Sequence, residues 1–313
     1  MSSNQDISLL ELETYVLQTL VSRSLRIATA SLLVYDTIIM FDKEVKYFWS
    51  KPRNFVSILY FTNRYLGLYG ALSKTYLDTF NASPKSTILK VDIVIGQFSA
   101  WSYNLANTIV TVIVDYILVM RVSALWGREK LLSTCLTMLI LVESIVSLVC
   151  FVLAEYLSSI SSLILTPSIS VCIVSADAGQ ESRVRVLALI DWLVVIAVGL
   201  VLMTLAVYKA IQYWNSSPLF KGYALVQVLI TDQLMWYFFI ISCGILNIIV
   251  FNIRSSNSLN TVILDAIGNP SFLSLIGCHM LFNLKIAGER GVSAGTDYSL
   301  STMSAVKFQE AGT

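Results

Sequence analysis

Apolar runs close to twenty residues long recur along the whole chain, and they limit its fold more than any other feature does. A run of about 20 apolar residues matches the hydrocarbon core of a bilayer when it forms an α-helix. Composition agrees, because 56% of the residues are hydrophobic and only 13% are charged, whereas soluble proteins average about half apolar and about a quarter charged. The runs are too long and too continuously apolar for the strands of a membrane β-barrel.

We therefore expect an all-α, polytopic integral membrane protein folded as a bundle of seven transmembrane helices. The seven predicted spans are Leu20–Phe41, Asn54–Leu72, Gln97–Met120, Leu131–Ala154, Val186–Tyr208, Val226–Phe251 and Val262–Leu284. This divides the chain into an outer N-terminal segment (residues 1–19), the bundle (20–284) and a Ser/Thr-rich tail (285–313) that we expect to be disordered in the cytosol.

The distribution of Lys and Arg predicts the orientation of the bundle, because cytosolic connections carry an excess of these residues. With the N-terminus outside and the C-terminus in the cytosol, the inner connections carry modestly more Lys and Arg than the outer ones. The stretch Val34–Phe55 then forms the first inner turn, with Tyr47, Phe48 and Trp49 at the membrane interface. The protein would reside in the plasma membrane or an endomembrane.

Two Asn-x-Ser triplets bear on this orientation, because such sites are glycosylated on the lumenal side only. Asn81 falls in the second connection, which we expect to be outside. Asn215 falls in the fifth connection, which we expect to be inside. Asn81 is therefore the candidate glycosylation site.

Three blocks of sequence resemble a known family. Leu32–Leu68 carries a Tyr35-Asp36 pair, an acidic stretch followed by Trp49, and Asn63-Arg64-Tyr65; Met120–Lys130 and Leu275–Glu289 are the other two blocks. Together they resemble uncharacterised basidiomycete, and hence fungal, seven-transmembrane proteins that carry an N-terminal domain of unknown function. The resemblance implies such a domain over residues 20–72 and a seven-helix fungal membrane protein, and it supplies no biochemical activity. His279 stands where the family pattern would place Arg.

Ionisable residues inside the predicted spans are the main functional candidates, because each costs roughly 2.5–3.5 kcal/mol at a helix centre unless it finds a partner or water. Asp36 and Arg64 lie on consecutive spans, which are usually neighbours in a bundle, so we expect them to pair. The pair is either a structural ion pair or part of a ligand or ion site. The full set is Asp36, Arg64, Asp115, Glu143, Asp191, Asp232 and His279.

A second group of residues suggests a ligand or ion pocket. Glu143 lies in the middle of the fourth span with no cation near it in sequence, which favours a protonated carboxyl, either proton-coupled or simply hydrogen-bonded to a neighbouring helix. Asp191 and Asp232 could line an outward-facing pocket for a cationic or amphipathic small ligand. The aromatic residues there are equally typical of interfacial anchors. The accompanying side chains are Trp192, Gln233, Trp236 and Tyr237.

Two further segments complete the interpretation. Polar residues from Gln97 to Asp115 repeat every three or four positions, so they share one helical face, which we expect to face the bundle centre. The fourth connection, Glu155–Arg185, is the longest, and we expect it to fold over the bundle mouth as a short hairpin or helix.

Several classes of function are disfavoured by residue content. The chain has five Cys and one His, with no CxxC motif or His pair, so no metal site is expected. No phosphate-binding loop or nucleophile elbow is present, and we expect neither a cofactor nor catalysis. The net charge of +1 gives no support to nucleic-acid binding.

These features together predict a receptor-like or sensor protein of the membrane. The alternative is a small-solute or proton-coupled transporter, and a third hypothesis is a structural membrane protein without a ligand. The expected partners are the lipid bilayer, a small-molecule ligand and a cytosolic effector at the inner connections and tail.

Overall fold

Helices dominate the computed structural model, which describes residues 9–49, 54–79, 88–127, 129–166, 169–175, 179–216, 223–253 and 259–286. A helix from residue 271 to residue 286 follows α7 after a short break, and we call it the half-helix. The other helices are α1 (Leu9–Glu44), α2 (Phe55–Thr79), α3 (Ile88–Leu125), α4 (Lys130–Leu157), α5 (Glu181–Ser216), α6 (Tyr223–Ile253) and α7 (Leu259–Ile267).

Five of the described helical stretches are long and apolar enough to cross a membrane, which indicates a multi-pass membrane protein. They are Val16–Trp49, Gly96–Leu125, Lys130–Leu157, Glu181–Gln212 and Leu259–Ile286. The sequence predicted seven spans. The two others correspond to α2, which is not among the five, and to α6, which contributes a shorter apolar stretch, Tyr237–Asn252.

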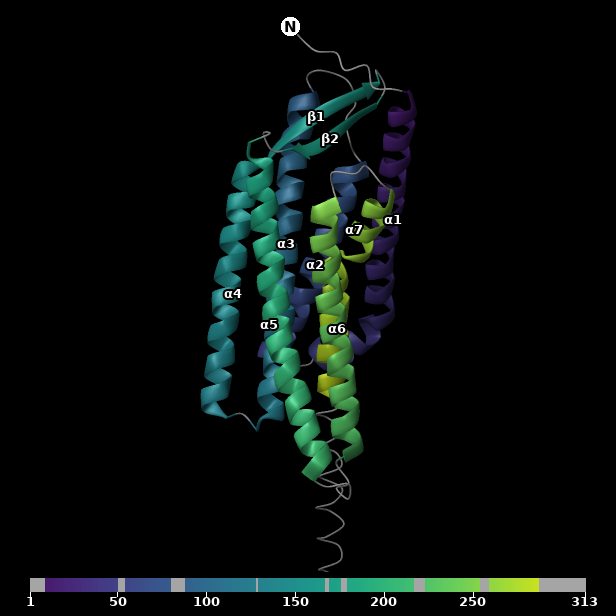
Figure 1. Cartoon of the computed structure of the whole chain (residues 1–313). Coiled ribbons are helices and arrows are strands. Elements are labelled where there is room, and N and C mark those ends of the chain that lie inside the picture. The colour runs from purple at the N-terminus through teal and green to yellow at the C-terminus, as the bar shows by residue number, and fades with distance from the viewer. Residues whose placement is uncertain are drawn as a thin grey trace, which may run out of the picture.

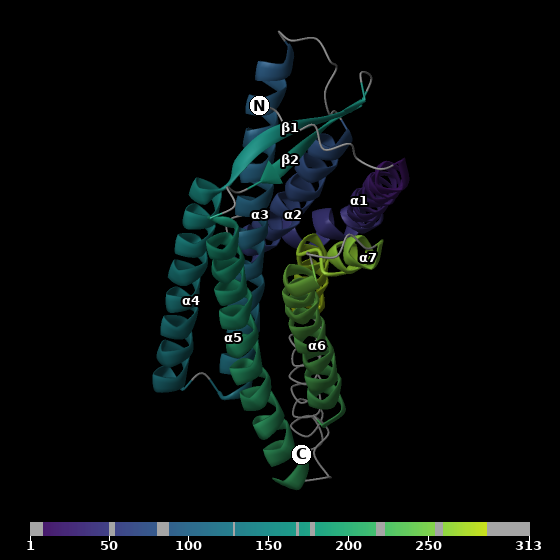
Figure 2. The same ribbon diagram turned by 45° about the horizontal axis from the view of Figure 1, so that its top comes forward.

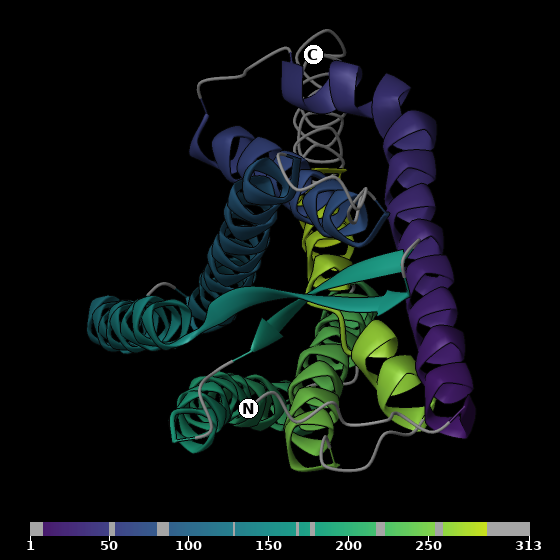
Figure 3. The same ribbon diagram turned by 90° about the horizontal axis from the view of Figure 1, so that it is seen from above.

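The long helices run side by side along the bundle (Figure 1). Each helix from α1 to α6 contacts the next, α6 contacts α7, and α7 contacts α1, so the ring closes. The view from above shows this closed order (Figure 3). α3 also contacts α5, and 56% of its apolar 18-residue segment is buried, a larger share than in the other four. A central position for the third helix agrees with its polar sequence.

A β-hairpin lies across one end of the bundle (Figure 2). Its strands, β1 (Ser159–Thr166) and β2 (Ile169–Ser175), pair antiparallel, with an irregularity between Ile164 and Thr166. β1 contacts α3. The expectation that the fourth connection folds over the bundle mouth is therefore confirmed, and it adds two strands to an otherwise helical fold. We call this end of the bundle the hairpin end and the other the opposite end.

The first helix continues past the predicted end of the first span. α1 reaches Glu44 and runs directly into one turn of π-helix, Val45–Trp49. The π-turn rotates Phe48 into the bundle, where its ring is fully buried and stacks on Tyr60 at a centroid distance of 3.9 Å. The Phe48 ring therefore packs inside the bundle and is not an exposed interfacial anchor, whereas Trp49 is exposed.

The last helix is interrupted where one continuous span was predicted. α7 ends at Ile267, and the half-helix begins after Gly268, Asn269 and Pro270. Pro has no N–H and favours the first turn of a helix, and Asn is a good N-cap. The Asn269 side chain accepts a hydrogen bond from the Ser271 N–H at 2.9 Å. The Gly268 carbonyl, left without a helical partner, accepts one from the Asn247 amide at 2.7 Å.

Candidate functional site

Arg64 lies at the centre of a buried polar cluster between α1 and α2. Its Nε is 3.2 Å from Glu44 Oε2, and its Nη1 is 3.8 Å from Asp36 Oδ2. The guanidinium also donates hydrogen bonds to the Asp36 carbonyl at 3.2 Å and to the Tyr60 hydroxyl at 2.7 Å. One side chain therefore holds the end of α1 against the middle of α2.

Glu44 is fully buried and has partners of its own besides Arg64. The Tyr65 hydroxyl donates to Glu44 Oε1 at 3.1 Å, and the Trp49 indole N–H approaches the same oxygen at 3.4 Å. These contacts exist because α1 extends through Glu44 and the π-turn follows it.

The half-helix closes the cluster through the one His of the chain. His279 Nε2 is 2.9 Å from Asp36 Oδ1. We call Asp36, Glu44, Tyr60, Arg64 and His279 the Arg64 cluster. It brings two carboxylates and one guanidinium into the bundle interior, with His279 beside the less buried carboxylate.

The structure brings together Asp36 and Arg64, the two residues that the sequence suggested as a pair. Sequence reasoning missed the part of Glu44, because the first helix was expected to end at Phe41. Sequence reasoning also assigned no partner to His279. Because ionisable residues inside spans normally have partners, a lone His there predicts an acidic residue on another helix.

All members of the Arg64 cluster except His279 fall within one short part of the chain. Residues 24–69 match the model of a family of unknown function, DUF6533. We call the matched segment the DUF6533 domain, and it comprises the second half of α1, the π-turn and the first part of α2. Comparison with curated proteins gives no match. The DUF6533 domain contributes four residues to the cluster, and the half-helix contributes the fifth, His279, from the far end of the sequence.

A second polar site lies between α3, α4 and α5, and we call Asp115, Glu143 and Asp191 the carboxyl row. Asp115 and Glu143 are buried and their carboxyl groups lie close to one another, and none of their four carboxyl oxygens has a hydrogen-bond donor in the described part of the structure. The carboxyl group of Asp191 is close enough to that of Glu143 for the two to interact electrostatically. Ser147 lies within hydrogen-bond reach of Asp191. Two carboxylates in contact in a dry interior repel, so a proton shared between Asp115 and Glu143 is the stable arrangement.

Only some of the residues predicted to line the ligand pocket have described side chains. Glu143 and Asp191 are neighbours in the carboxyl row. The backbone of Asp232, Gln233 and Trp236 belongs to α6, but their side chains lie outside the described part of the structure. Asn81 also lies outside it, as does the tail beyond residue 286. Among the described residues, no group of three His, Cys, Asp or Glu side chains is arranged to hold a metal ion.

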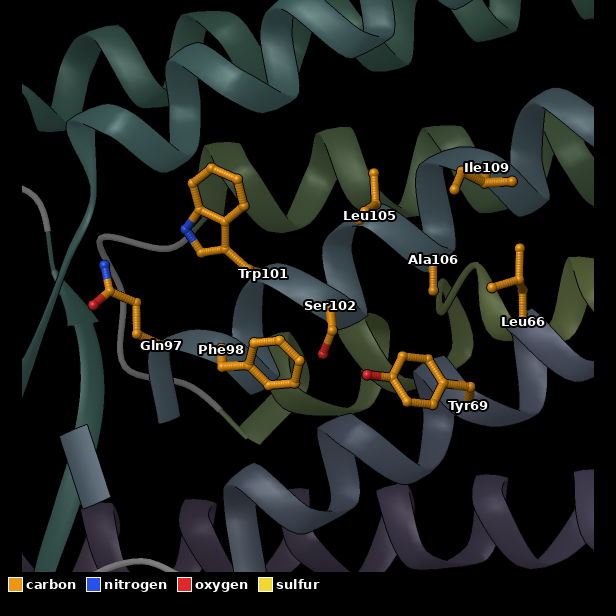
Figure 4. Close-up of a pocket in the computed structure, with 9 residues that line it drawn as sticks. All are labelled: Leu66, Tyr69, Gln97, Phe98, Trp101, Ser102, Leu105, Ala106 and Ile109. Atoms are coloured by element: carbon orange, nitrogen blue, oxygen red, sulfur yellow. The ribbon is translucent and has the colours of Figure 1, made fainter. Parts of the chain in front are cut away.

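The polar face of α3 divides between the bundle interior and its outside. Asn104 donates a hydrogen bond to Glu155 of α4, and Asn107 and Asp115 are buried, as expected for a face directed at the bundle centre. Gln97 and Trp101 instead line an outward-open pocket of about 620 Å³ between α2 and α3 (Figure 4). The other lining residues are Leu66, Tyr69, Phe98, Ser102, Leu105, Ala106 and Ile109.

Proposed function

We propose that the chain is a receptor-like sensor of a fungal membrane, with seven spans, the N-terminus outside and the half-helix carrying the signal to the cytosolic side. The observation that carries the proposal is the interruption of the last helix at Gly268–Pro270. Interrupted membrane helices occur where the unpaired backbone is buried in protein. A break allows the helical segments on its two sides to move independently. The half-helix is then an element that can shift while α7 stays in place.

Contacts to three other helices hold the half-helix, and these are the contacts that a shift would remake. His279 meets Asp36 of α1, and Arg121 of α3 donates a hydrogen bond to the Met280 carbonyl. Between α2 and the half-helix, the Asn63 amide donates to the Ser274 carbonyl at 2.7 Å, and the Ser274 hydroxyl donates to the Asn63 carbonyl at 2.8 Å. A signalling transition needs an element with two discrete arrangements, and directional contacts of this kind favour discrete arrangements over continuous sliding.

The orientation and the hairpin support the same proposal. With the N-terminus outside, the hairpin covers the outer end of the bundle, where a ligand would arrive, and the predicted effector surface lies at the opposite end. The Lys and Arg distribution along the connections supports this orientation.

The experiment measures the distance between the half-helix and α4 near the opposite end. Spin labels go on Asn283→Cys and Leu131→Cys, two exposed positions, with Cys135 and Cys172 replaced by Ser, in nanodiscs. We expect two distance populations in the parent protein. Arg121→Met, which removes the hydrogen bond to the Met280 carbonyl, should shift their ratio. A single unchanged distance in both proteins would contradict the proposal.

The carboxyl row favours a second candidate function, proton-coupled transport, because buried carboxyls in contact are typical of proton relays. The two functions differ in what Glu143→Gln does. In proteoliposomes with a pH-sensitive dye inside, a transporter should carry protons, and the amide should abolish that flux. A sensor should show no flux in either protein, and a purely structural protein should show neither flux nor two distance populations.

A further inference from the structure

The Arg64 cluster carries one more carboxylate than guanidinium, and a proton on His279 would neutralise the excess negative charge. Asp36 and Glu44 bring two negative charges, and Arg64 brings one positive charge. A buried charge is costly unless it is paired. An imidazolium at His279, 2.9 Å from Asp36, would make the cluster neutral.

Other charged and titratable groups also lie around His279. The charged groups that act on the adjacent Cys278 are Arg64, Asp36 and Glu44. Arg121 of α3 binds the Met280 carbonyl, Lys43 of α1 lies over the Phe282 ring at 5.8 Å, and Lys285 of the half-helix lies over the Phe48 ring at 4.6 Å. The remaining titratable groups facing the cluster are the Tyr60 and Tyr65 hydroxyls of α2 and the Cys278 thiol.

Exposure places the proton-accepting pair at the accessible edge of the cluster. The side chains of His279 and Asp36 are 30% and 19% exposed, whereas those of Arg64 and Glu44 are 5% and 0% exposed. His279 and Asp36 therefore form the more exposed edge of the cluster, and the Arg64–Glu44 pair forms its closed interior.

We propose that His279 is a proton-sensing residue whose protonation binds the half-helix to Asp36 of the DUF6533 domain. This rests on the proposed movement of the half-helix and names what controls it. At low pH the imidazolium neutralises the cluster and holds the half-helix against α1. As pH rises the ring becomes neutral, one carboxylate is left without a cation, and the half-helix is released. Imidazole is the side chain that ordinarily changes charge between about pH 5 and 8.

The test repeats the Asn283 and Leu131 distance measurement at about pH 5.5 and about pH 8. The parent protein should show a several-fold change in the ratio of the two populations. His279→Arg, which carries a permanent charge, should stay in the low-pH arrangement at both values. His279→Gln and Asp36→Asn should stay in the high-pH arrangement. A pH response that survives in His279→Arg would overturn the proposal.

The outcomes separate this inference from the proposed function. Two populations whose ratio ignores pH would overturn the role of His279 and leave the sensor proposal standing. One population under every condition and in Arg121→Met would overturn both. If the His279 variants do not fold, nitrogen-15 magnetic resonance of the parent protein decides, because the one His of the chain gives one pair of ring nitrogen signals. The ring should convert from imidazolium to neutral over the same pH interval as the distance change, and a ring that stays in one state would overturn the inference.

Discussion

Arg64 serves two carboxylates, so its removal should be among the most damaging single changes in the bundle. Removing one partner of a buried ion pair costs about 3–5 kcal/mol, because the other charge is left unpaired. We expect Arg64→Met to lower the free energy of unfolding by about 3 kcal/mol, measured by denaturant unfolding in detergent micelles. Adding Glu44→Gln should recover part of that loss, because it removes one of the stranded charges.

The matched control for Arg64 is an exposed ion pair of the same type. Arg185 and Glu181 lie one turn apart on α5, with Nη2 3.3 Å from Oε1 and both side chains exposed to a large degree. Such pairs contribute about 0.3–0.5 kcal/mol, so Arg185→Met should change stability little. Equal losses from Arg64→Met and Arg185→Met would show that burial does not determine the contribution of the Arg64 pair.

At the Asp115–Glu143 contact, unlike at Arg64, we expect one polar substitution to be tolerated. Glu143→Gln gives Asp115 a permanent hydrogen-bond donor in place of a shared proton, so stability at about pH 8 should be kept or increased. Glu143→Ala removes the partner, leaves Asp115 alone in the interior, and should cost about 1–3 kcal/mol. Thermal unfolding of the two variants side by side provides the measurement, and a large loss in Glu143→Gln would argue against the shared proton.

For individual residues, the sequence identified the ionisable side chains inside the spans more reliably than it identified their contacts. Asp36 and Arg64 could be paired because consecutive spans are neighbours. Glu143 was identified as a buried carboxyl, but its contact with Asp115 depends on the rotation of α3 and α4 about their axes, which apolar runs do not specify. His279 lies 243 positions from Asp36 in sequence, and no local pattern links residues at that separation.

Close packing of α2 against the half-helix depends on one glycine. A Cβ added at Gly67 would overlap the Cβ and hydroxyl of Ser274, which real structures do not tolerate. Gly67→Ala should therefore push the half-helix away and cost about 1–3 kcal/mol in the unfolding free energy. The exchange variant Gly67→Ala with Ser274→Gly should restore most of the stability, apart from the lost Ser274 hydrogen bond.

A glycine of α5 is the control for this helix contact. A Cβ at Gly199 would meet its nearest neighbour, Ile241, at an ordinary 3.9 Å. Because Ala is favoured over Gly inside a helix by about 1 kcal/mol, Gly199→Ala should be neutral or stabilising. If Gly67→Ala behaved like Gly199→Ala, the close approach of α2 and the half-helix would be wrong.

The interruption of the last helix predicts a specific role for Asn247. Its amide donates to the carbonyls of Gly268 and Cys243, and it occupies the gap that the break leaves. Asn247→Ala should leave the Gly268 carbonyl with fewer partners and cost about 1–3 kcal/mol, measured by thermal unfolding. Asn252→Ala, which removes an exposed bond to the Ile248 carbonyl of its own helix, should have little effect.

Elements were predictable where hydrophobicity alone decides them. The predicted spans lie on the observed helices, because about 20 apolar residues define a membrane helix whatever their neighbours are. The break at Pro270 was missed although Pro is a clear signal, since the apolar run continues on both sides of it. The π-turn was missed for a different reason: charged residues from Asp42 onward were interpreted as leaving the membrane, whereas Glu44 turns back to Arg64.

The orientation of the whole bundle can be measured with glycosylation reporters placed in each connection. We expect modification at the N-terminus, at Asn81 and beside the hairpin, and none at Asn215 or in the tail. The reason is that the positively charged connections stay in the cytosol. Modification at Asn215 would invert the bundle or change the number of spans, and the sensor proposal would then lose its support.

The ring of helices in chain order was predictable only as a tendency of consecutive helices to pack together. Its closure, by contact of α7 with α1, was not predictable, because it depends on tilt angles that composition does not encode. The hairpin over the end was expected from the length of the fourth connection, but its strand register comes from backbone pairing that only the structure shows.

The split of the Arg64 cluster between the two ends of the sequence has a consequence for biogenesis. The DUF6533 domain is synthesised and inserted first, so Asp36, Glu44 and Arg64 enter the bilayer long before the ribosome reaches His279. During that interval Asp36 lacks the contact that His279 makes in the finished bundle. The Arg64 cluster is therefore complete only when the half-helix has been synthesised and packed against α1.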